Sequence, residues 1–157
     1  MKKIAFVVLL IIFQSIALFS QVLTNLDFDV NYKQLVNELK SKNYVQVSEN
    51  ENIVLLKGVT LNKNVDLVIT FSKRTYTVLS LYILFEKLVD KKERKIFYNY
   101  LNEIFLKTYG QPKSFDKMFD ILFGSTSWKI DDVMITIGQI KQSNQVYISY
   151  TQMNRLI

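Results

Sequence analysis

The chain has 157 residues, of which 49% are apolar and 22% are charged, and its formal net charge is +6. This length fits one domain, and the composition excludes an intrinsically disordered chain. Cysteine and histidine are both absent. Their absence excludes disulfides and removes the usual ligands and bases of zinc, haem and nucleophile–histidine sites, so we expect no cofactor and no metal.

The N-terminus has the pattern of a signal peptide. Lys2 and Lys3 form a short basic region, and residues 4–13 form an unbroken apolar run. This run is too short to cross a bilayer, which takes about 20 residues, and small residues that suit cleavage follow it. We therefore expect a signal peptide at residues 1–20 and one domain at residues 21–157. The domain would be periplasmic or secreted, and its membrane contact would be limited to the transient signal peptide or the protein's surface.

The first predicted helix follows Asn31. Asn31 and Gln34 have the spacing of a capping box, and Asn43 is suited to closing the helix in the left-handed conformation. One face carries apolar residues at helical spacing: Tyr32, Leu35, Val36 and Leu39.

A second helix is predicted at residues 90–110. Asp90 and Glu93 have capping-box spacing, and Gly110 with Pro112 ends the helix. Its apolar stripe is wide and predicts packing against a sheet or another helix: Ile96, Phe97, Tyr100, Leu101, Ile104, Phe105 and Tyr109.

Seven strands are predicted from alternating apolar residues and polar turns. They are residues 44–48, 53–60, 65–71, 77–85, 126–130, 133–140 and 146–151. Residues 77–85 are apolar on both faces, which predicts a central strand covered on more than one side. Residues 114–124 fit either a short helix or an irregular or extended segment. Tight turns between strands favour an α+β fold, with a mainly antiparallel sheet and two helices packed on one face.

Several short motifs carry a family resemblance. They are Phe19-Ser20-Gln21, Leu56-Lys57-Gly58, Tyr109-Gly110-Gln111-Pro112, Trp128 and Tyr150. In this order the chain resembles uncharacterised small secreted or periplasmic proteins of Bacteroidota. The resemblance favours cleavage after Ser20 over cleavage after Ala17. It implies no activity and no functional residue.

Candidate catalytic groups are few. The hydroxyl residues 125–127 have no histidine to activate them, and Asp131 with Asp132 sits at a predicted turn. Asp116 and Asp120 are four residues apart and would share one face of a helix. Paired carboxylates can hydrolyse glycosides, so a carboxylate-based hydrolase remains the second alternative function. The main expectation is that the protein is not an enzyme.

The strongest candidate surface is aromatic. Tyr76 and Tyr82 are expected on one face of strand 77–85, and Tyr147 on the last strand opposite its apolar neighbours. Tyrosines on an exposed sheet face are suited to binding a partner. We therefore predict an exported, non-catalytic binding protein that recognises a protein or peptide through a sheet face. An inhibitor or immunity-like role is one form of this function.

A basic run opens the second helix and supports the first alternative. Lys91, Lys92, Arg94 and Lys95 place positive charge at a helix N-terminus, where it does not stabilise the helix. The run suggests a small amphiphilic or anionic envelope ligand, such as a lipid or glycan. Export argues against nucleic acid as the partner.

Overall fold

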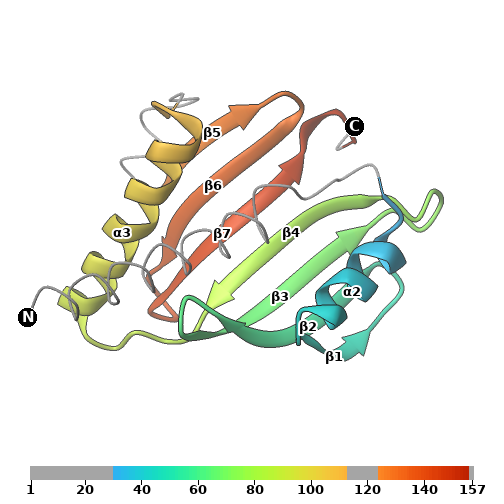
Figure 1. Ribbon diagram of the computed structural model, residues 1–157, viewed down its shortest axis with the longest axis horizontal. Coiled ribbons are helices and arrows are strands. Elements are labelled where there is room, and N and C mark those ends of the chain that lie inside the picture. The colour runs from blue at the N-terminus through green and yellow to red at the C-terminus, as the bar shows by residue number, and fades with distance from the viewer. Residues whose placement is uncertain (1–29, 113–123, 156–157) are drawn as a thin grey trace, which may run out of the picture.

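The structure, a computed structural model, describes residues 30–112 and 124–155. The predicted signal peptide and nearly all of the ambiguous segment at 114–124 lie outside these residues. In chain order the described elements are α2 (Tyr32–Ser41), β1 (Val45–Glu49), β2 (Ile53–Thr60), β3 (Lys63–Phe71), β4 (Val78–Phe85), α3 (Lys91–Tyr109), β5 (Thr126–Ile130), β6 (Val133–Ile140), β7 (Gln145–Gln152) and the 3₁₀ turn η1 (Met153–Arg155) (Figure 1).

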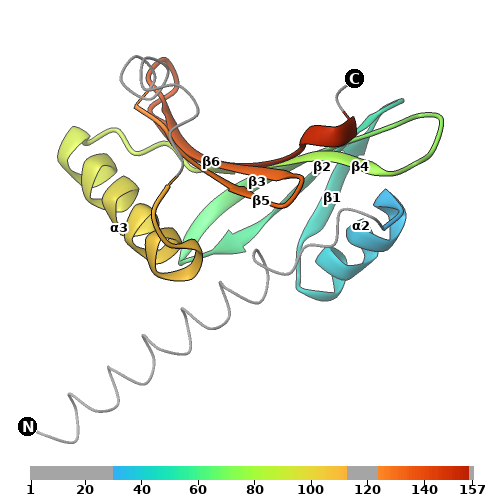
Figure 2. The same ribbon diagram turned by 90° about the horizontal axis from the view of Figure 1, so that it is seen from above.

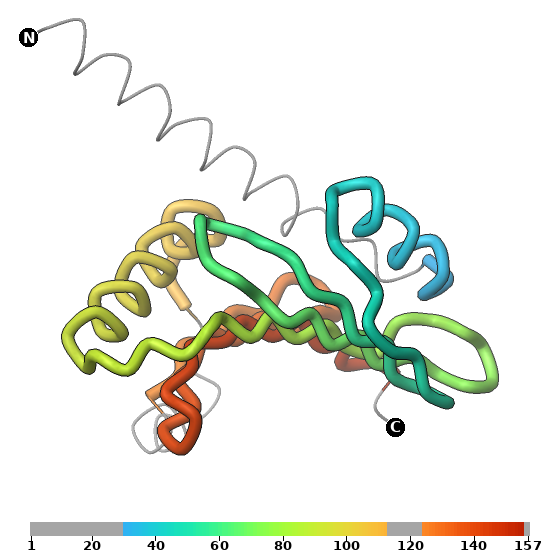
Figure 3. Tube along the Cα trace, turned by 90° about the horizontal axis from the view of Figure 1, so that it is seen from below, coloured from blue at the N-terminus to red at the C-terminus, as the bar shows by residue number. Residues whose placement is uncertain are grey.

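The strands form one open sheet. Seven strands lie in the order β1-β2-β3-β4-β7-β6-β5, and every neighbouring pair is antiparallel. Helix α3 packs against β5, β6 and β7, and α2 lies near β1. Both helices lie on the same side of the sheet, as Figures 2 and 3 show from opposite directions. The predicted α+β fold, with an antiparallel sheet and two helices on one face, is confirmed.

Strand β4 lies at the centre of the sheet, as its apolar sequence predicts, but its alternation is interrupted near its start. Thr70 pairs with Ser80, whereas Phe71 pairs with Val78, so Leu79 is an extra residue in a β-bulge. Val78 is consequently fully buried on the helix side. Both described helices lie on one side of β4, so no described helix covers its other side.

Helix α2 begins and ends as its sequence predicts. Both halves of the capping box between Asn31 and Gln34 are present. Asn43 has φ of 68°, the left-handed conformation that ends a helix. Tyr32 stacks on Phe71 with 3.8 Å between ring centroids, and this contact anchors the start of α2 to the end of β3.

Helix α3 has the expected ends, but only half of its predicted capping box. The Asp90 carboxylate accepts a hydrogen bond from the Glu93 amide at 2.8 Å. The Glu93 carboxylate does not accept a hydrogen bond from the Asp90 amide. It accepts one from Lys63 Nζ at 3.0 Å instead. The ion pair therefore joins the start of α3 to the start of β3. Gly110 has φ of 77° at the C-terminal end.

The apolar stripe of α3 is narrower than the sequence predicts. Phe97, Leu101, Ile104 and Phe105 are buried against the sheet. Ile96 is 61% exposed and Tyr100 is 37% exposed, so the prediction that both are buried is wrong. Each lies one residue before a buried neighbour, on the flank of the helix. Spacing alone does not separate the edge of a stripe from its centre.

Replacing Asp90 with alanine is expected to lower the free energy of unfolding by about 1 kcal/mol, because the first turn of α3 loses its capping acceptor. Urea unfolding followed by circular dichroism measures this change. Glu103→Ala, at an exposed position in the interior of α3, is the control and should change stability by less than about 0.5 kcal/mol. Equal effects of the two substitutions would contradict the role of the cap.

Alkaline pH is expected to weaken the fold through two tyrosines. Burial raises the pKa of Tyr109 to about 12 and raises the pKa of Tyr150 well above 10. In the unfolded chain a tyrosine titrates near pH 10. The folded state therefore holds these protons more tightly, and the stability they contribute is present below about pH 10 and lost as the pH rises further.

Urea midpoints measured between about pH 9 and about pH 11.5 test this expectation, since these values bracket the titration of an unfolded tyrosine. The midpoint should fall above about pH 10. Tyr109→Phe should make the fall smaller. A midpoint that stays constant over this range would contradict the argument.

Candidate functional site

The sheet face away from the helices, here called the open face, carries a continuous set of apolar and aromatic side chains. The β-strand register places Tyr82 between Val68 of β3 and Ser149 of β7. Leu84, two residues along β4, is opposite Tyr147. We call Leu55, Val68, Tyr82, Leu84 and Tyr147 the open-face patch. Tyr82 is 37% exposed, and the other four are half-buried.

Tyr147 lies against the sheet because of a glycine. Gly138 of β6 is its cross-strand partner, and a Cβ at Gly138 would lie 2.5 Å from Cε1 of the Tyr147 ring. The ring therefore occupies the space that a side chain at position 138 would fill. Burial raises the pKa of the Tyr147 hydroxyl, and the nearby hydroxyls of Tyr82 and Tyr98 raise it further. The hydroxyl consequently stays protonated at neutral pH and can donate a hydrogen bond.

Small hydroxyl residues extend the open face beside the patch. Thr70 and Ser80 are hydrogen-bonded across β3 and β4 at 2.6 Å, and Ser127 and Thr136 across β5 and β6 at 3.0 Å. Ser149 lies between these pairs and is buried by its neighbours. The open face thus combines an apolar patch with a polar region, so it offers both contact area and hydrogen-bonding groups.

Tyr76 does not belong to this face, contrary to the sequence prediction. It lies in the turn between β3 and β4 with φ of 58°, outside both strands. Its ring centroid is 6.2 Å from that of Tyr32, at the start of α2. The bulge at Leu79 and this turn break the alternation that would have placed Tyr76 beside Tyr82.

The basic run lies at the start of α3, away from the open-face patch. Lys91, Lys92 and Lys95 are exposed. Arg94 is half-buried, and its Nη1 donates to the carbonyl of Leu88 at 2.6 Å. Three of the four cations are therefore presented to solvent, whereas the fourth holds the loop before the helix. Val89, 81% exposed, lies two residues before Lys91.

Of the acidic and hydroxyl candidates, Asp132, Thr126 and Ser127 have hydrogen-bond partners. Asp131 has φ of 51° in the turn between β5 and β6, and Asp132 accepts from Asn154 Nδ2 at 3.0 Å. Thr126 is hydrogen-bonded to Tyr98 at 2.9 Å. Asp116 and Asp120 lie outside the described residues. Within 30–112 and 124–155, no three acidic side chains gather as metal ligands.

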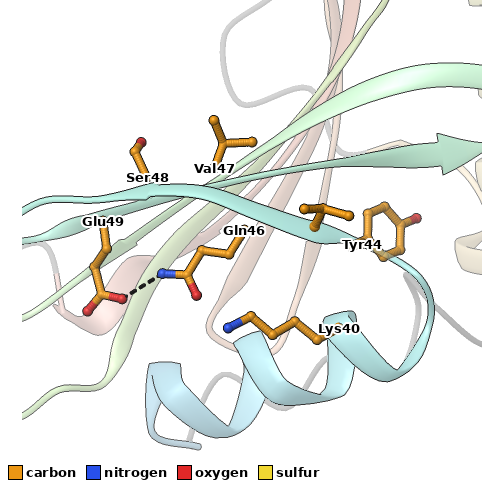
Figure 4. A pocket seen from close by; sticks show the side chains of 7 residues that line it. Lys40, Tyr44, Gln46, Val47, Ser48 and Glu49 are labelled. Atoms are coloured by element: carbon orange, nitrogen blue, oxygen red, sulfur yellow. Dashed lines mark hydrogen bonds between the residues drawn. The ribbon is translucent and has the colours of Figure 1, made fainter.

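A groove that the sequence did not indicate lies between α2 and β1. It is an open groove of about 590 Å³, and Figure 4 shows Lys40 extending from α2 towards β1 while Gln46 and Glu49 extend from β1 towards α2. The Tyr32 hydroxyl donates to Glu49 Oε1 and Gln46 Nε2 donates to Glu49 Oε2, each at 2.8 Å. These two hydrogen bonds lower the pKa of Glu49, and the bond from Tyr32 has the larger effect. The carboxylate is therefore ionised and held in the groove wall.

Sequence reasoning missed Leu55 and Val68 as members of the patch. Their positions opposite the buried residues of β2 and β3 were a usable signal, because side chains alternate across a strand. Which strands lie next to one another was the missing information.

No α-helix in the described part of the chain is long and apolar enough to cross a bilayer. Comparisons with protein-family models, with curated proteins and with solved structures found no match.

Proposed function

We propose that the protein is an exported, non-catalytic binding module that recognises a partner protein or peptide through its open face. The observation that carries the proposal is the apolar face of β4. Tyr82 and Leu84 lie on the central strand of the sheet, yet no described helix covers them. A contiguous apolar patch on a soluble domain is a mark of an interaction surface.

The residue types of the patch support recognition of a protein. Tyrosine loses little side-chain entropy on binding, and it offers both an apolar ring and a hydrogen-bonding hydroxyl. Tyr147 is held against the backbone at Gly138, so its side chain has less conformational entropy to lose on binding. The surrounding hydroxyls would supply the polar rim that such interfaces have.

Site-specific photo-crosslinking tests the proposal in the cell that exports the protein. A benzophenone amino acid replaces Tyr82 or Tyr147 on the open face, and Tyr100 on α3 is the control. Tyr82 and Tyr100 are the same residue type and are each 37% exposed. Adducts with one discrete partner are expected from positions 82 and 147 and not from position 100. Adducts that form equally at all three positions, or at none, would refute the proposal.

The basic run supports a second candidate function, the binding of an anionic envelope ligand. The specific observation is that Lys91, Lys92 and Lys95 are solvent-exposed and that Val89, two residues before Lys91, is exposed as well. Cations beside an exposed apolar residue suit the headgroup region of an anionic membrane.

Sedimentation with anionic and with neutral lipid vesicles tests this second function. Binding to the anionic vesicles alone, and its loss in a variant with Lys91, Lys92 and Lys95 replaced by serine, would support it. Arg94 is left in place because it holds the loop before α3. Equal sedimentation of the triple variant and the unmodified chain would exclude it.

A further inference from the structure

Strand β1 forms one edge of the sheet. It pairs with β2 on one side, and no described strand pairs with its other side. An edge strand presents unpaired backbone N–H and C=O groups, which an added strand can use. The five residues of β1 span about 16 Å in extended conformation.

The helix beside this edge leaves room for another chain. The 590 Å³ groove is lined by Lys40 and by every residue from 44 to 49, so it follows β1 along its length. A helix on one side and a strand edge on the other is a geometry that suits an extended peptide segment.

A bulge in β1 arranges the side chains of the groove. Gln46 pairs with Leu56 and Ser48 with Leu55, so Val47 is the extra residue. Regular alternation would put Glu49 on the same side as Val45; the bulge turns Glu49 towards α2 instead, where Tyr32 binds it. Val45 and Val47 are 66% and 54% exposed and are available to contact an added strand.

The charge of the groove favours an acidic occupant. Both oxygens of Glu49 already accept hydrogen bonds, from Tyr32 and from Gln46. Lys40 is exposed and acts on Glu49 only through space, without an ion pair to any acid among the described residues. The carboxylate is thus engaged within the wall, and the ammonium group of Lys40 is left to face the groove.

We propose that the edge of β1 accepts an extended segment of a partner protein, which adds as a further strand in the groove and places a carboxylate beside Lys40. Backbone hydrogen bonds to β1 supply affinity, Val45 and Val47 contact apolar side chains, and Lys40 selects an acidic one. This site is separate from the open-face patch, so it holds or fails independently of the proposed function.

The test uses a displayed library of random twelve-residue peptides selected on the full-length chain. The expected consensus alternates apolar residues and contains Asp or Glu. The enriched peptide is then synthesised, and its affinity is measured for the unmodified chain, for Lys40→Glu and for Lys107→Glu. Lys107 is the matched control, because it is the basic residue in the last turn of α3 as Lys40 is in the last turn of α2.

Lys40→Glu is expected to weaken binding about tenfold or more, and Lys107→Glu less than about twofold, when circular dichroism shows both variants folded. Amide hydrogen exchange at residues 44–49 should slow on binding. The inference is overturned if no acidic consensus is enriched, or if the two lysine variants behave alike. It is also overturned if the slowed amides lie in β4 and β7, an outcome that would favour the open face instead.

Discussion

Replacing Trp128 with alanine is expected to lower the free energy of unfolding by about 3–5 kcal/mol. Trp128 is 2% exposed and its ring centroid is 5.7 Å from that of Phe105 of α3. Its Nε1 also donates to the carbonyl of Gly110, at the end of the same helix, at 2.9 Å. One side chain therefore fills the core under α3 and holds the end of that helix to the edge strand β5.

Trp128→Phe separates the contribution of core packing from that of the hydrogen bond to Gly110. Phenylalanine keeps an aromatic ring in the core but cannot donate to Gly110. The loss of unfolding free energy should therefore be smaller than that for Trp128→Ala but greater than zero. Urea unfolding must be followed by circular dichroism, because Trp128 is the one tryptophan of the sequence and its fluorescence is lost with it. A loss below about 1 kcal/mol for Trp128→Ala would mean that the ring is not part of the core.

Gly58→Ala is expected to cost about 1–3 kcal/mol through overpacking. A Cβ at position 58 would lie 2.3 Å from Cδ1 and 3.0 Å from Cγ of the Tyr44 ring. Tyr44 is 6% exposed, and its amide donates to the carbonyl of Leu39 at 3.1 Å in the turn between α2 and β1. Since the contact includes the base of the ring, Tyr44 cannot turn away without moving this turn.

Gly138→Ala is the matched control for Gly58→Ala. Its Cβ would meet Cε1, Cζ and the hydroxyl oxygen of Tyr147. These atoms are the far end of a half-buried side chain on the open face, which can swing outward. Thermal melts should therefore show a smaller loss of stability for Gly138→Ala than for Gly58→Ala. The reverse order would contradict the packing described for both rings.

Local sequence patterns predicted most of the fold. Strands β2, β5 and β6 begin and end where the alternation of apolar residues places them. The ends of α2 follow from Asn31, Gln34 and Asn43, whose side chains and backbone act within one turn of the helix. These features depend on neighbours in the sequence, and a single sequence contains that information.

The errors arise where distant segments decide the geometry. The bulge at Leu79 arises because Val78, and not Leu79, pairs with Phe71 of the neighbouring strand. Together with the turn before β4, it separates Tyr76 from Tyr82. Ile96 and Tyr100 have the spacing of buried residues, but they are exposed on the flank of α3, and which flank a sheet covers depends on strands distant in the sequence.

The candidate sites could be predicted only in part, for the same reason. The alternation along β4 and β7 put Tyr82 and Tyr147 outward, but their proximity depends on β7 lying next to β4, a pairing between distant segments. The groove beside Lys40 depends on β1 being the edge strand and on the bulge at Val47. Neither condition leaves a signal in the local sequence.

The affinity of the cross-linked partner for Tyr82→Ser, compared with Tyr100→Ser, tests recognition through the open face most directly. The two tyrosines are equally exposed. Tyr82 is on the open face, whereas Tyr100 is on α3, the helix that packs against the other face of the sheet. We expect Tyr82→Ser to weaken binding about tenfold or more, as the loss of a central aromatic contact does, and Tyr100→Ser to change it less than about twofold. Unchanged affinity for Tyr82→Ser, or an equal loss in both variants, would contradict recognition through this face.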